Sequence, residues 1–177
     1  MTGTVEAELE QFARGDIQAF ETLFREYQGQ VYGWIVRIVR DPGAAEDLTV
    51  ETFWRIYRAH ARFDPGRPFG AWARRIATNL ALEHLSRHRP EEPHGWDFPA
   101  RAAPSGAVDA DLRAKVLAAF GELPAKLRAA ATLAMIEETP YAEIAEALGI
   151  SVNGVKSRVF RAVRLLRKSL EKRGVRP

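Results

Sequence analysis

The chain contains no cysteine, only two methionines and no long apolar run. Without cysteine there is no disulfide bond, no thiolate zinc site and no cysteine nucleophile. The sequence also shows no signal peptide, no apolar segment of about 20 residues that would span a membrane, and no glycine-rich nucleotide loop. We therefore expect a cytoplasmic protein with no membrane insertion, no bound cofactor and no metal.

Acidic residues are scarce near the end of an otherwise mixed sequence. The chain has 177 residues and a net charge of +3, with a pI near 9.4. This length allows two small domains. From residue 150 onward Glu171 is the only acid among many lysines and arginines. Such a concentration of positive charge favours nucleic-acid phosphate as a partner, with an ordinary solvated helix as the alternative.

Residues 139–162 have the pattern of a helix-turn-helix. Thr139 is expected to cap a first helix that begins at Pro140, and Gly149 to end it in a left-handed turn. The apolar face of this helix would consist of Tyr141, Ile144, Ala145 and Leu148. Ser151 is expected to cap the second helix. The buried stripe of the second helix would consist of Val152, Val155, Val159 and Leu166.

The opposite face of this second helix is polar and basic. In a helix-turn-helix, the second helix lies in the DNA major groove, and its N-terminal half reaches the base edges while flanking cations bind phosphates. The residues that present this face are Asn153, Lys156, Ser157, Arg158, Arg161 and Arg164.

The rest of the chain also has helical periodicity, so we predict an all-α fold. Helices are expected from Ile17 to Ile38, from about Ala44 to His60, and from about Phe69 onward, with a turn at 41–43 and a loop at 62–68. Residues 90–108 have no period and contain several prolines, which indicates an extended linker. Trp96 and Phe98 in this linker either dock on a domain or a partner, or stay solvated. The expected architecture is a helical domain at 8–89, the linker, and a four-helix domain at 109–173.

A family resemblance becomes specific at this point. The motifs Ala45-Glu46-Asp47-Leu48-Thr49, Glu51-Thr52-Phe53 and Phe69-Gly70-Ala71-Trp72-Ala73-Arg74-Arg75-Ile76-Ala77-Thr78-Asn79 precede the linker and the helix-turn-helix. This order resembles bacterial RNA polymerase sigma factors, in particular the extracytoplasmic-function (ECF) group of the sigma-70 family, over about residues 8 to 172. The resemblance implies a non-enzymatic factor that binds core RNA polymerase and directs promoter-specific transcription initiation.

The resemblance also implies which residues meet the polymerase. The clamp helices of the largest subunit would contact Asp47, Leu48, Glu51 and Phe53, although Leu48 and Phe53 also suit a core. Val50 stands where the family commonly has glutamine. The flap of the second-largest subunit and an anti-sigma factor are further candidate partners by the same resemblance.

Promoter DNA would meet both domains. The resemblance implies that minus-ten DNA is read as a melted single strand, with Asn79 at the edge of a flipped base. Unpaired bases need aromatic surface, amides and cations, and the chain supplies Phe63, Arg67, Arg74, Arg75 and Asn79. Phe69 and Trp72 fit this strand or the core. For the minus-thirty-five element the family adds Phe160 to the helix face given above, whereas Glu83, Ser86 and Gly154 depart from the family pattern.

Two other functions compete with this interpretation. A stand-alone helix-turn-helix regulator would bind duplex DNA as a dimer without polymerase. A helical metal enzyme could use His84 and His88, which lie four residues apart beside Glu83. The metalloprotease motif requires glutamate directly after its first histidine, however, and Leu85 occupies that position with no third ligand evident.

Overall fold

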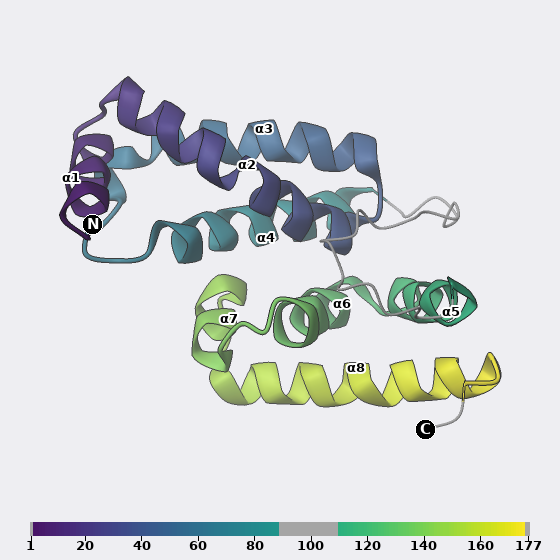
Figure 1. Cartoon of the computed structure of the whole chain (residues 1–177). Helices are drawn as coiled ribbons and strands as arrows, with labels where there is room; N and C mark the ends of the chain where they lie inside the picture. Colours follow the sequence, from purple (N-terminus) through teal and green to yellow (C-terminus); the bar gives the residue numbers. More distant parts are fainter. Residues whose placement is uncertain (1, 89–109, 176–177) are drawn as a thin grey trace.

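The structure is a computed structural model that describes residues 2–88 and 110–175. The expected linker, with Trp96 and Phe98, lies outside the described residues. Within these two ranges every regular element is a helix or a helical turn, and the helices form two domains (Figure 1). The predicted all-α class is therefore confirmed. No helix in the described ranges is both long and apolar enough to cross a membrane.

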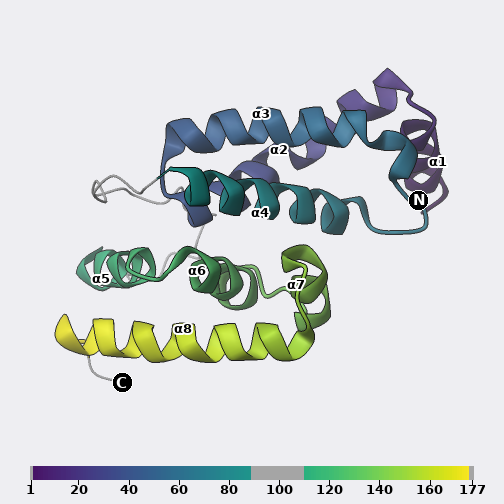
Figure 2. The same cartoon turned by 180° about the vertical axis from the view of Figure 1, so that it is seen from behind.

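The first domain contains four α-helices, and Figure 2 shows them from behind. They are α1 (Thr2–Ala13), α2 (Ile17–Val39), α3 (Pro42–Arg58) and α4 (Phe69–Arg87), with the short 3-10 helix η1 (His60–Arg62) after α3. Asp16 caps α2 by accepting hydrogen bonds from the backbone N–H groups of Gln18 and Ala19. Asp41 caps α3 in the same way, with Pro42 at the first position. The second predicted helix thus begins two residues before Ala44, because proline is tolerated where no N–H is needed.

An aromatic cluster around Phe12 fills the core of this domain. Phe12 lies 5.7 Å from Phe63 and 5.6 Å from Phe69 between ring centroids, and Trp72 packs 5.0 Å from Phe63. Phe63 is 5% exposed and Phe69 is 2% exposed. Helix α1 therefore anchors both the loop that precedes α4 and the first turn of α4.

The second domain contains the predicted helix-turn-helix. Its elements are α5 (Ala110–Gly121), α6 (Ala125–Ala131), the π-helical turn η2 (Thr132–Ile136), α7 (Tyr141–Leu148) and α8 (Val152–Lys172). Gly149 ends α7 with a φ of 62°, in the left-handed region that favours glycine. The Ser151 hydroxyl accepts a hydrogen bond of 3.1 Å from the Gly154 N–H at the start of α8. Both predicted helix signals, Gly149 and Ser151, are confirmed.

Three predictions about helix starts are wrong. Pro140, not Thr139, takes the N-cap position of α7, and the hydroxyl of Thr139 is buried without a hydrogen-bond partner among the described groups. The first residues of the two helices, Tyr141 and Val152, are 37% and 39% exposed and do not belong to the buried faces. The reason is that helical side chains tilt toward the N-terminus, so a side chain in the first turn projects beyond the end of its helix. Ala162 completes the stripe of α8 instead, with Val155, Val159 and Leu166.

The two domains pack against each other. Helices α2 and α4 face α6 and α7 across the boundary (Figures 1 and 2). Ala129 of α6 belongs to the core cluster of the first domain, and Leu148 of α7 packs against the same cluster. The boundary therefore has apolar contact as well as the polar contacts described below.

Candidate nucleic-acid interface

Helix α8 presents its polar face to solvent. Phe160 is 65% exposed in the middle of this face. Arg158 is half-buried, and the Arg161 Nε donates a hydrogen bond of 3.3 Å to the Ser157 carbonyl oxygen. The exposed side chains are those of Asn153, Lys156, Ser157, Phe160, Arg161 and Arg164. Because no carboxylate among the described residues pairs with the cations of this face, they remain available for phosphates.

Helix α4 presents a second polar surface. Arg75 and Asn79 are exposed and lie one helical turn apart. Arg74 is less accessible, since its guanidinium lies 4.9 Å from the centroid of the Trp34 ring and donates a hydrogen bond of 3.1 Å to Glu143. Arg67, in the loop before α4, donates two hydrogen bonds of 2.8 and 3.3 Å to the carboxylate of Glu146. The structure thus places Arg75 and Asn79 together in solvent and Arg67 and Arg74 against the second domain.

The aromatic residues expected near melted DNA lie mostly inside the first domain. Phe63 and Phe69 are buried, and Trp72 is half-buried beside them. In this conformation Phe63 offers no surface for base stacking. Its position instead supports the 62–69 loop from within, and the spacing of the aromatics alone could not separate these two roles.

Helix α3 presents a mixed acidic and apolar face. Asp47 is exposed, and Glu51 is half-buried and accepts a 2.8 Å hydrogen bond from the Arg55 Nε. Of the apolar residues predicted for polymerase binding, Leu48 is half-buried and packs on the core, whereas Phe53 is 3% exposed and its ring lies 4.7 Å from that of Phe24.

Two exposed apolar side chains lie on this same helix. Val50 is 68% exposed and Trp54, one turn later, is 55% exposed. Sequence reasoning treated Val50 only as a departure from the family and missed Trp54. The available signal was that Trp54 does not fit the apolar period of Leu48, Phe53, Ile56 and Tyr57. An exposed tryptophan next to acidic residues is typical of a protein-binding surface.

The histidine pair considered as a metal site lies at the end of α4. The rings of His84 and His88 are stacked with centroids 4.3 Å apart. Burial, followed by the nearby charge of His88, lowers the pKa of His84, although Asp41 acts in the opposite direction. In the part of the chain that the structure describes, no three metal-ligating side chains gather around a common point.

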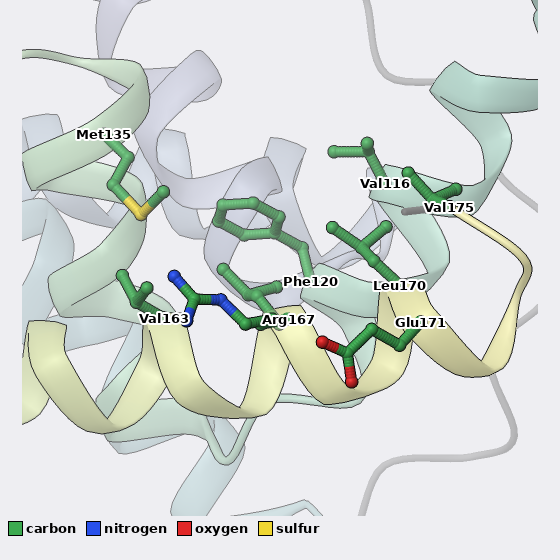
Figure 3. Close-up of a pocket in the computed structure, with 9 residues that line it drawn as sticks. Val116, Phe120, Met135, Val163, Arg167, Leu170, Glu171 and Val175 are labelled. Carbon is green, nitrogen blue, oxygen red and sulfur yellow. The ribbon is translucent and has the colours of Figure 1, made fainter. Parts of the chain in front are cut away.

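An apolar groove runs between α5 and the C-terminal half of α8 (Figure 3). Its volume is about 310 Å³, and Arg167 and Glu171 provide its charged lining. Its apolar lining consists of Val116, Phe120, Met135, Val163, Leu166, Leu170 and Val175. The sequence analysis did not foresee this surface, because its residues come from separate helices and from the segment after α8.

The fold and these surfaces define a bipartite, all-helical DNA-binding protein with a helix-turn-helix in its second domain. Comparison with known families agrees: residues 23–91 match Sigma-70 region 2, and residues 113–166 match Sigma-70, region 4. The chain belongs to the ECF group of the sigma-70 family of RNA polymerase sigma factors.

Known relatives cover nearly the whole chain. The chain is 35% identical over 178 residues to RNA polymerase sigma-H factor of Pseudomonas aeruginosa, with 92% of each chain covered. It is 30% identical over 184 residues to ECF RNA polymerase sigma factor SigW of Bacillus subtilis, with 94% of this chain and 96% of the relative covered. Among solved structures, CnrH in complex with the cytosolic domain of CnrY has 27% identity and a TM-score of 0.70, covering 94% of this chain and 97% of CnrH.

Family membership settles the coarse function. A sigma factor acts in promoter-directed transcription initiation, and it regulates transcription without being the catalyst.

Proposed function

We propose that this chain recruits core RNA polymerase to promoters by reading the minus-thirty-five element as duplex and capturing the minus-ten element as a melted strand. The observation that carries the proposal is the exposed, cation-rich face of α8 around Phe160, where no described carboxylate competes for the arginines. The proposed domains are 8–89 for polymerase binding and the minus-ten element and 109–173 for the minus-thirty-five element.

Helix α8 is the proposed reader of the minus-thirty-five element. Lys156 and Arg161 suit guanine edges or phosphates, and Phe160 suits a thymine methyl group or a sugar. Asn153, Ser157, Arg158 and Arg164 extend this surface along the helix. Because the Gly154 N–H is already bonded to Ser151, we assign phosphate contacts at the helix start to Asn153 instead.

Helix α4 is the proposed reader of the melted minus-ten strand. The exposed amide of Asn79 can pair with the edge of an unstacked base, and Arg75 can hold the backbone beside it. The Trp72 ring is half-buried, and its accessible part could stack on a base. Phe63 holds the pocket wall from within, and Arg67 and Arg74 supply further phosphate contacts once they are free of the second domain.

Helix α3 is the proposed polymerase-docking surface. Asp47 and Glu51 would fix how this chain is oriented on the clamp helices of the largest subunit. Val50 and Trp54 would provide apolar contact area. Phe53 supports this face from the core. We assign the flap of the second-largest subunit to the apolar groove of Figure 3, because that groove lies away from the base-reading half of α8. CnrH is solved in complex with the cytosolic domain of another protein, CnrY, and by analogy we propose that this chain also binds a regulatory protein, an anti-sigma factor.

The test combines the full chain with bacterial core polymerase and a promoter library. We expect a complex on gel filtration, selection of fragments that core polymerase alone does not bind, and permanganate-reactive thymines in those fragments. Asn79→Ala should abolish the permanganate signal and keep the gel-filtration complex. Tight duplex binding by the isolated chain as a dimer, without a polymerase complex, would favour the stand-alone regulator instead.

A further inference from the structure

Two arginines from different domains converge on one glycine. Arg40 ends α2, and Arg128 lies on α6, which packs against α2 (Figures 1 and 2). One Nη of Arg128 donates a hydrogen bond of 3.0 Å to the Gly121 carbonyl oxygen and a longer one of 3.5 Å to that of Leu123. The Arg40 guanidinium lies over Gly121, in the space that a Cβ atom there would fill. The missing side chain of Gly121 therefore lets the two guanidinium groups come close to each other.

This pair of arginines has no acidic partner. No carboxylate in the described ranges pairs with Arg40 or Arg128. The acids beside them in the chain are engaged elsewhere, since Asp41 caps α3 and Glu122 accepts hydrogen bonds from α8. The Nε atoms of Arg40 and Arg128 are both buried without a hydrogen-bond partner among the described groups. The pair thus keeps unused donors for a negatively charged group.

Burial makes two like charges at this place costly. Arg128 is only 7% exposed. Burial, followed by the charge of Arg40, lowers the pKa of Arg128 to about 10, so Arg128 is still protonated at neutral pH. Burial also lowers the pKa of Arg40. A buried cation needs an opposite charge and hydrogen bonds to offset its lost hydration, and two backbone carbonyl groups supply only part of this. The missing component is a negative charge.

We propose that Arg40 and Arg128 form a binding site for a small tetrahedral oxyanion of the phosphate class. Guanidinium groups bind phosphate oxygens through charge-assisted and often bidentate hydrogen bonds. Arg40 is half-buried, so the site is reached from solvent on its side, while Arg128 supplies its charge from the interior. The bound ion contacts both domains and offsets the repulsion between the two cations, so it stabilises the folded chain. Neither arginine belongs to the DNA surfaces proposed above, and the inference does not depend on them.

The test measures binding of inorganic phosphate to the full chain by titration calorimetry, and its effect on the melting temperature, with sodium chloride keeping the ionic strength constant. Arg40→Gln removes one cation of the site, and its control Arg25→Gln removes an exposed cation of the same helix. Gly121→Ala keeps every charge, but its Cβ would lie 1.4 Å from the Arg40 Nη1, so the guanidinium must move. The matched control is Gly29→Ala, whose Cβ would enter open space on α2.

We expect phosphate to bind the wild type and both controls and to raise their melting temperatures. Arg40→Gln and Gly121→Ala should each weaken phosphate binding about tenfold relative to their controls, because each takes a charged donor away from the ion. Unchanged phosphate affinity in both of these variants would overturn the inference. Stabilisation of the wild type by chloride as large as that by phosphate would overturn it too, because water and chloride would then satisfy the two cations.

A second titration, with adenosine monophosphate, distinguishes the source of the phosphate group. Binding of the nucleotide that Arg40→Gln and Gly121→Ala weaken would assign the site to a nucleotide phosphate as well as to the free ion. Binding of inorganic phosphate alone, weakened by the same variants, would assign it to the free ion. Both results support an oxyanion site between α2 and α6. The proposed function fails separately, since the polymerase complex and promoter opening are measured without added phosphate.

Discussion

The hydroxyl of Ser169, on α8, donates a hydrogen bond of 2.6 Å to the carboxylate of Glu122, which directly follows α5. The same carboxylate accepts a second hydrogen bond, from Arg173. Together these contacts fasten the C-terminal end of α8 to the rest of its domain.

This contact predicts a pH dependence of stability. Hydrogen bonds from Arg173 and then Ser169 lower the pKa of Glu122 below its ordinary value of 4.5. Because the folded-state pKa is depressed, the stabilisation is present above the unfolded pKa and is lost as the pH falls through the folded pKa. We expect Glu122→Gln to lower the melting temperature slightly at pH 7 and to match the wild type in strong acid. A difference in melting temperature between Glu122→Gln and the wild type that persists in strong acid would contradict this prediction.

Loss of the Ser151 cap of α8 should lower the stability of the protein. Ser151→Ala removes the acceptor of the Gly154 N–H and should cost about 1 kcal/mol in the free energy of unfolding. Ser151→Asn keeps an acceptor and should restore most of that loss. Urea denaturation measures both. Equal stability of the alanine and asparagine variants would exclude the capping role.

Two neighbouring residues on α3 should separate binding from folding. Trp54→Ala removes an exposed ring, so we expect core polymerase affinity to fall by about 2 kcal/mol with little change in stability. Phe53→Ala removes a buried ring and should cost about 3–5 kcal/mol of stability. Fluorescence titration with core polymerase and urea denaturation provide the two readouts. Full polymerase affinity in the Trp54 variant would place the docking surface elsewhere.

Removing a cation of α8 and removing its aromatic ring should change the salt dependence of DNA binding differently. Lys156→Ala should weaken holoenzyme binding to duplex minus-thirty-five DNA for all sequences and reduce the slope of log affinity against log salt by about 1. Phe160→Ala should leave the slope unchanged, because the ring releases no counterion. A salt titration by fluorescence anisotropy separates the two. An altered slope in the Phe160 variant would mean that the helix had shifted on the DNA.

The sequence predicts features that depend on neighbouring residues well, and contacts between residues far apart in the sequence poorly. Gly149 and Ser151 act within one turn of their own positions, so spacing alone locates them. Spacing fails at the first residues of helices, as at Tyr141 and Val152, since a first-turn side chain reaches past its own helix.

Spacing also cannot divide aromatic residues between core and binding surface, which is why Phe63, expected beside melted DNA, is buried in the first domain. The pairing of Arg74 with Glu143 spans 69 residues of sequence, and only the packed domains bring the two together.

The π-helical turn η2 sets the rotational phase of the residues after it. The Glu137 N–H bonds back to the Thr132 carbonyl oxygen, at 3.1 Å, so one extra residue is accommodated in this turn. A helix rotates by about 100° per residue. The carboxylate of Glu137 accepts hydrogen bonds from the Arg37 guanidinium and from the Trp34 indole N–H, both in the first domain. A chain shortened by one residue at 132–136 would wind as an ordinary helix and rotate this carboxylate away from both donors. The extra residue in this single turn therefore directs the Glu137 carboxylate at the first domain.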